Sequence, residues 1–77
     1  MSSPSQHIGS RIRIQRGMMR ISQDELGKML SPSVSQQVMS KMERGGKQPS
    51  ASQIFQLAHY LEVPVSYFFE GLVMPKS

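Results

Sequence analysis

Apolar residues recur at helical spacing along most of the chain, and turn-forming residues interrupt them at short intervals. From Gln6 onward, Ile8, Ile12 and Met19 fall on one stripe of a helical wheel. No segment alternates convincingly between apolar and polar residues as a strand would. The pattern predicts a compact all-α domain at residues 6–73, flanked by tails at 1–5 and 74–77. Its five short helices are expected at about 6–19, 23–30, 36–44, 50–61 and 64–71.

Capping and helix-breaking residues mark the ends of these helices. Ser22 and Glu25 have the spacing of a capping box, in which each side chain accepts a backbone N–H of the other residue. Pro32 ends the second helix, because the residue before a proline avoids the α region, and Ser35 is placed to cap the third. Gly27 falls on the inward side of the second helix, where the missing side chain lets another helix come close.

The third predicted helix, residues 36–44, has two faces of different chemistry. Val38, Met39 and Met42 project to one side, and the opposite arc of about 140° carries no acid. Glutamine can bond to N6 and N7 of adenine, and lysine or arginine to O6 and N7 of guanine. The arc either reads base edges in DNA or is an ordinary solvated face, and the helix alone leaves both open. Its members are Gln36, Gln37, Ser40, Lys41 and Arg44.

The charge of the chain is concentrated in its first part. Of the net charge of +4, residues 1–48 contribute +5, from eight basic and three acidic residues, and residues 49–77 contribute −1. All five aromatic residues lie at Phe55 or later. A basic amino-terminal part favours a polyanion such as nucleic acid or a membrane surface as the partner.

Other chemistry finds little support in the sequence. The chain has no cysteine, and His7 and His59 lie far apart without a pattern of carboxylates near them. We therefore expect no metal, no cofactor, no small-molecule ligand and no enzymatic activity. No apolar run approaches the roughly 18 residues of a membrane span and no secretory signal opens the chain, so we expect a cytoplasmic protein that associates with the nucleoid when it binds DNA.

Four motifs in order, SQDEL, VSQQ, ERG and LEVPVSYFF, make the chain resemble the lambda-repressor-like (Cro and repressor type) helix-turn-helix domains over roughly residues 8–72. The resemblance implies a recognition helix, residues 36–44, that enters the major groove and reads bases through the five polar side chains of the arc. It also implies that Arg16 pairs with Glu43, which the wheel places at the edge of the buried arc. A second set of residues is expected to contact DNA phosphates: Gln23, Ser33, Ser35, Gly46, Lys47, Gln48 and Arg20.

The chain departs from the family pattern in the turn before the third helix, at Gly27, where alanine is usual, and at Arg20. The usual turn holds about three residues with glycine first, whereas Ser31-Pro32-Ser33 precedes Val34 here, so we expect a turn enlarged by two residues. The glycine that often ends the first helix is Arg20, which leaves that turn less relaxed or places Arg20 against the DNA backbone. The placement of Gln36 depends on how the enlarged turn folds.

The last predicted helix carries more apolar surface than it can bury within its own domain. Phe68 and Leu72, four residues apart, are expected in the core. The remaining apolar residues either pack internally or form a symmetric dimer interface. These are Val65, Tyr67, Phe69 and Val73.

A dimer would place two recognition helices about 34 Å apart to read a near-palindromic operator, an inverted repeat. We therefore expect a homodimeric transcriptional regulator that represses or activates promoters, with two dimers on adjacent operators as a further possibility. The alternative is a protein-interaction module, such as an antitoxin or anti-activator, built on the same scaffold. An acidic or apolar recognition face would favour that alternative, and this face is neither.

Overall fold

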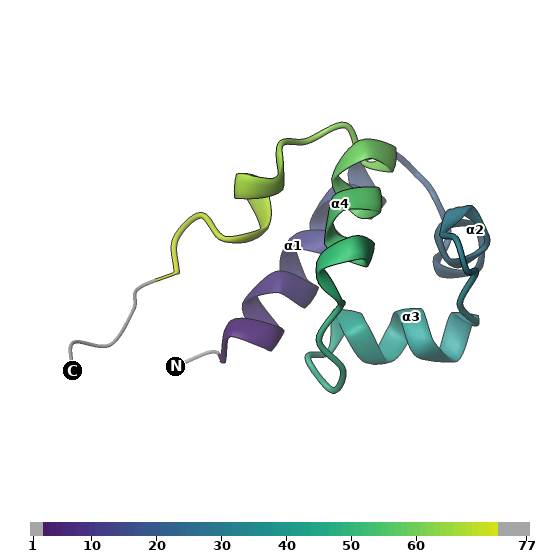
Figure 1. Cartoon of the computed structure of the whole chain (residues 1–77), viewed down its shortest axis with the longest axis horizontal. Coiled ribbons are helices and arrows are strands. Elements are labelled where there is room, and N and C mark those ends of the chain that lie inside the picture. The colour runs from purple at the N-terminus through teal and green to yellow at the C-terminus, as the bar shows by residue number, and fades with distance from the viewer. Residues whose placement is uncertain (1–2, 73–77) are drawn as a thin grey trace.

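The computed structural model describes residues 3–72, and this part of the chain is helical without a strand (Figure 1). Its α-helices are α1 (Pro4–Met18), α2 (Gln23–Met29), α3 (Gln36–Glu43) and α4 (Ala51–Tyr60), and a 3-10 helix, η1 (Val65–Phe68), follows them. Helix α3 packs against α1 and α2, while η1 packs against α1 and α4. In Figure 1, α3 runs crosswise to α1 and α4, and α2 lies at the end of α3 where α3 begins.

The structure changes the predicted boundaries at both ends of the domain. Helix α1 begins at Pro4, because Ser3 and Gln6 form a capping box and proline suits the first helical turn. The prediction of a tail through Ser5 is therefore wrong for Pro4 and Ser5. The expected fifth helix at 64–71 is the single 3-10 turn η1, and the chain leaves it toward Gly71 with a positive φ of 89°.

One hydrophobic core joins all the helical elements. The inward side of α2 and the apolar side of α4 are buried, as are Ile8 and Ile12 of α1 and two methionines of α3. Phe68 is fully buried and Leu72 is half-buried. The predicted capping box of Ser22 and Glu25 at the start of α2 is confirmed, and its hydrogen bonds from Ser22 lower the pKa of Glu25. The buried cluster comprises Ile8, Ile12, Leu26, Leu30, Met39, Ile54, Leu57, Ala58, Leu61 and Phe68.

Two buried glycines allow the backbones around α3 to come close. A Cβ atom on Gly27 would lie 2.4 Å from the carbonyl oxygen of Val34. The absence of a side chain there lets the segment that leads into α3 pass close to α2. A Cβ atom on Gly9 would lie 2.3 Å from the carbonyl oxygen of Met42, at the crossing of α1 and α3. Neither contact is possible with a larger residue unless the backbone shifts.

The connection from α2 to α3, residues 30–35, is held by α2 and α4 and ends in the cap of α3. The Val34 N–H donates to the Gly27 carbonyl at 3.0 Å. The Gln56 side chain on α4 clasps Ser31: its Oε1 accepts from the Ser31 N–H at 2.8 Å and its Nε2 donates to the Ser31 carbonyl at 3.0 Å. Ser35 then caps α3 by accepting the Val38 N–H at 3.2 Å. The start of α3 is thereby held by α2 and α4 together.

Arg20 occupies a left-handed conformation, with φ of 58°, where the chain turns out of α1. This conformation costs a residue with a Cβ atom roughly 1–2 kcal/mol. We therefore expect Arg20→Gly to raise the free energy of unfolding by about 1 kcal/mol, measured by urea denaturation. Arg20→Ala, which removes the same charge and keeps the Cβ atom, is the control and should bring no such gain. A glycine variant no more stable than the alanine variant would contradict this account.

Candidate nucleic-acid interface

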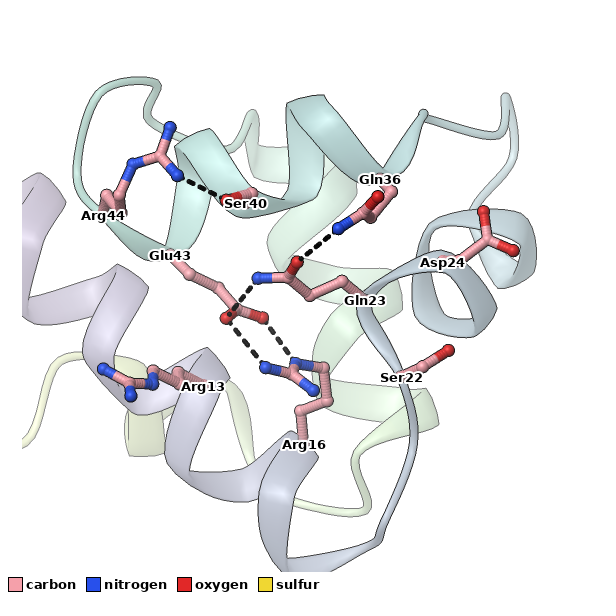
Figure 2. A pocket seen from close by; sticks show the side chains of 9 residues that line it. All are labelled: Arg13, Arg16, Ser22, Gln23, Asp24, Gln36, Ser40, Glu43 and Arg44. Atoms are coloured by element: carbon pink, nitrogen blue, oxygen red, sulfur yellow. Dashed lines mark hydrogen bonds and ion pairs between the residues drawn. The ribbon is translucent and has the colours of Figure 1, made fainter.

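A polar cleft of about 610 Å³ opens between α1, the start of α2 and the exposed side of α3 (Figure 2). Its wall on α3 includes Gln36 and Ser40, two of the five side chains predicted to read bases. Gln23 and Asp24 line it from α2, and Arg13 lines it from α1. The cleft therefore brings residues that are far apart in the sequence next to the polar arc of α3.

A bidentate ion pair forms the floor of this cleft. Arg16 Nε donates to Glu43 Oε2 at 2.6 Å and Arg16 Nη2 donates to Glu43 Oε1 at 3.1 Å. The Glu43 side chain is only 3% exposed, and its hydrogen bond raises the pKa of Arg16. Arg16 Nη1 also donates to the carbonyl of Ile21 at 2.9 Å, which ties the connection between α1 and α2 to the pair. The two residues expected to pair from the resemblance thus lie in direct contact.

The ion pair continues to the surface through two glutamines (Figure 2). Gln23 Nε2 donates to Glu43 Oε1 at 3.1 Å, and Gln36 Nε2 donates to Gln23 Oε1 at 3.2 Å. We call Arg16, Glu43, Gln23 and Gln36 the polar relay. It links α1, α2 and α3 and ends at Gln36, which is exposed.

The relay determines which way the Gln36 amide faces. A carboxylate only accepts hydrogen bonds, so Gln23 must turn its NH₂ group toward Glu43 and its oxygen toward Gln36. Gln36 must then turn its own NH₂ group toward Gln23. The Gln36 oxygen and its second N–H are left to face outward as one acceptor and one donor.

The other predicted base-reading residues divide into two rows along α3. Gln37 and Lys41 are exposed and do not line the cleft. Ser40 and Arg44 line the cleft, and Arg44 Nη1 donates to Ser40 Oγ. The five side chains therefore share a surface, but the structure holds Gln36, Ser40 and Arg44 in place through hydrogen bonds.

The predicted phosphate-contacting residues are in different situations. Gly46 does not offer a free amide, because its N–H donates to the Lys41 carbonyl at 2.9 Å and closes the end of α3. The Ser35 hydroxyl is used as the α3 cap. Gln48 Oε1 accepts from Ser5 Oγ at 2.9 Å. Ser33, Lys47 and Arg20 are exposed, so their side chains are accessible to a ligand.

A second, apolar groove of about 400 Å³ lies on the surface formed by α1, α4 and η1. Val65 and Phe69, both predicted at a dimer interface, line it and are each 41% exposed. Phe55 of α4 also lines it and is 71% exposed, although the sequence reasoning did not single it out. Its place directly after the buried Ile54, off the apolar stripe of α4, was the available signal.

Two residues predicted at the same interface stand apart. Tyr67 is half-buried against the core, its ring lies 4.4 Å from the Arg11 guanidinium, and its carbonyl accepts from Arg11 Nε at 3.1 Å. Val73 lies outside the described residues. The exposed large apolar residues that line this groove are thus Phe55, Val65 and Phe69.

Arg13 was also missed, although it precedes Arg16 by three residues and so shares its side of α1. Among residues 3–72, no three histidine, aspartate or glutamate side chains are placed to hold a metal ion. No helix in this part of the chain is long and apolar enough to span a membrane.

Comparison with known proteins assigns the chain to a family. A helix-turn-helix family model matches residues 12–68. The chain is 42% identical over 64 residues to an uncharacterised HTH-type transcriptional regulator of Sinorhizobium medicae, which covers 83% of this chain and 45% of that protein. It is 38% identical over 66 residues to an uncharacterised transcriptional regulator in the ATPase CF(0) region of Rhodospirillum rubrum, covering 86% of this chain and 59% of that protein.

The chain spans about half the length of these curated relatives. The matched region includes the polar relay, the connection at 30–35 and the buried face of α4. The chain therefore belongs to the lambda-repressor-like helix-turn-helix family of transcriptional regulators.

Proposed function

We propose that this protein is a sequence-specific, DNA-binding transcriptional regulator that places α3 in the major groove of its operator. The observation that carries the proposal is the polar relay, which starts at a buried ion pair and presents one oriented amide, Gln36, on an acid-free surface. A merely solvated face would need no such support. A base-reading side chain benefits from it, because an amide held in advance loses less conformational freedom on binding.

The orientation of Gln36 favours adenine as its partner. Its outward oxygen can accept from the adenine N6 amino group, while its second N–H donates to N7. Gln37 and Lys41 would read neighbouring base pairs from the outer row of α3. Ser33, Lys47 and Arg20 would contact phosphates, with Gln23, Ser35 and Gln48 beside them.

The enlarged turn is compatible with this placement. The connection at 30–35, which we expect to be two residues longer than in the family pattern, is held against α4 and α2 by Gln56 and Gly27. The extra residues therefore need not displace α3. Ser33 projects from this connection as an exposed hydroxyl that a phosphate oxygen can reach.

A second copy of the chain is the proposed occupant of the apolar groove. Gln48 and Pro49 form one rim of it, so it continues from the loop that follows α3. A two-fold axis through this face would leave both recognition helices free to reach two half-sites of an inverted repeat. Whether the dimer represses or activates would depend on the position of the operator relative to the promoter, and two dimers on adjacent operators would permit both.

Selection of duplexes from a random library, followed by binding titration, tests the DNA-binding proposal. We expect a preferred near-palindrome containing adenine in each half-site. Gln36→Ala combined with Gln37→Ala should lower the preference for the selected site over a scrambled duplex by at least roughly thirty-fold, since each bidentate contact contributes about 1–3 kcal/mol. Enrichment of no sequence, or a preference unaffected by the double change, would refute base reading and favour the protein-interaction alternative.

Measurement of molecular mass in solution tests the dimer. We expect Phe55→Ser with Phe69→Ser to convert the protein to a monomer, because each side chain is exposed in the isolated chain and its loss leaves the core intact. The free energy of unfolding of the monomer at low concentration should change little. Met18→Ser, at a residue 74% exposed and remote from the groove, is the matched control. A variant that remains dimeric would place the interface elsewhere.

A further inference from the structure

We propose that Arg13 and Arg44 form a clamp for one phosphate of the operator backbone, at the end of the polar cleft opposite Ser22 and Asp24. This inference rests on the proposed function and deepens it. It adds Arg13 to the interface and reassigns Arg44 from reading bases to binding the backbone.

The first argument is the balance of charge in the cleft. Of its two acidic residues, Glu43 is paired with Arg16, and Asp24 is paired with Lys28 at 2.9 Å. The ion pairs among residues 3–72 are three, and neither Arg13 nor Arg44 takes part in one. Two positive charges in one cleft are thus left without an acidic partner, and both remain able to pair with an anion.

The second argument is the position of the two guanidinium groups. Figure 2 shows Arg13 and Arg44 at the same end of the cleft, on the side away from Ser22 and Asp24. Arg44 caps the end of α3, and its bond to Ser40 Oγ draws its side chain back along the helix. Gln37 and Lys41 do not line the cleft. Arg44 therefore lies on the wall of the cleft that α3 forms, with its guanidinium group held at Ser40.

The third argument is the chemistry of the ligand. Arginine presents up to five N–H donors in a plane, and only one of those of Arg44 is used by Ser40. A phosphate group with two free oxygens accepts from guanidinium groups on both sides, which suits Arg better than a point-charged lysine. When the base edges of a duplex face Gln36, the phosphates of the DNA backbone pass the cleft beside α3. The clamp takes one of them.

The test compares variants on the selected operator and on a scrambled duplex over a range of salt concentrations. We expect Arg13→Gln and Arg44→Gln each to weaken binding to both duplexes by the same factor, about tenfold, so that the preference for the operator is unchanged. The double variant should lower the slope of log K against log salt by about 0.9, the value for one phosphate contact. Its loss should be less than the product of the single losses, because both side chains hold the same phosphate.

Arg11→Gln is the matched control, because it removes the same charge from α1 on the side that faces Tyr67. It should leave the salt slope unchanged, and urea denaturation checks that all variants are folded. Neutral methylphosphonate linkages, introduced singly into the operator, should include one position where wild type and the double variant bind equally.

Three results would overturn the clamp. An Arg44 variant that loses preference for the operator reads a base; an Arg13 variant that behaves like Arg11→Gln contacts no phosphate; and independent losses in the double variant mean two separate contacts. In each case Gln36→Ala with Gln37→Ala still reports on base reading with the same duplexes. Failure of the clamp is therefore distinguishable from failure of the proposed function.

Discussion

Replacing Glu43 by alanine is expected to remove most of the free energy of unfolding of the protein at 25 °C. The change removes both carboxylate bonds of Arg16, whose side chain is only 18% exposed, and the acceptor of Gln23 Nε2. Leaving one partner of a buried ion pair without the other costs about 3–5 kcal/mol. A domain of this size has a total stability of only about 5 kcal/mol. The measurement is the helical circular dichroism signal through a thermal and a urea transition.

A paired replacement separates the cost of a lone charge from the contribution of the pair. Arg16→Met with Glu43→Leu removes both charges and fills the space with apolar atoms, so most of the lost stability should return. The relay would nevertheless be broken, because Gln23 would have no carboxylate to orient it. We expect this variant to be folded and to discriminate poorly between the operator and a scrambled duplex. Full stability of Glu43→Ala, or full discrimination by the pair, would contradict the role assigned to the relay.

Alanine at Gly9 is expected to destabilise the protein by about 3 kcal/mol, near the upper end of what overpacking costs. Its Cβ atom would lie 2.3 Å from the Met42 carbonyl oxygen and 2.6 Å from that of Glu43. Both are backbone atoms, so relief requires α1 and α3 to move apart. That movement would also lengthen the Arg16–Glu43 contact, and the variant should lose DNA discrimination along with stability.

Gly17 provides the matched control on the same helix. A Cβ atom there would meet nothing within 4 Å, so only helix propensity changes. Gly17→Ala should raise the free energy of unfolding by about 0.5–1 kcal/mol. If packing at the α1–α3 crossing destabilises Gly9→Ala, urea denaturation should show its free energy of unfolding lowered and that of Gly17→Ala raised. Two shifts of the same sign would mean that the crossing adjusts to the added methyl group.

Local patterns in the sequence predicted most of the fold because they are local in the structure too. The apolar stripe of α4 and the box of Ser22 and Glu25 depend on residues a few positions apart. The start of α1 follows the same rule, and the spacing of Ser3 and Gln6 was a signal that went unused. Gly9 differs, because a helical glycine does not reveal which distant carbonyl lies against it.

In the candidate site too, features that depend on local spacing were predicted and features that depend on the folded backbone were not. The helical wheel separated the polar arc of α3 from its buried face, and the resemblance suggested the ion pair. The sequence did not show that Gly46 uses its N–H within the chain, or that Arg44 lines the cleft while it is bonded to Ser40. These features depend on the local path of the backbone and on rotamers, which residue type and spacing leave undetermined.

If the proposed dimer binds an operator, the hydrogen bonds of Gln56 to Ser31 limit how far it can adjust to that operator. Gln56 and Phe55 are neighbours in α4. The same helix therefore supports the start of α3 through Gln56 and lines the proposed dimer contact through Phe55. Inserting one base pair between half-sites turns the second by roughly 35°. A flexible hinge between α3 and the dimer contact would let α3 follow that rotation. Helix α4 instead holds α3 at a fixed distance and angle from the dimer contact. The protein should accordingly accept a single half-site spacing.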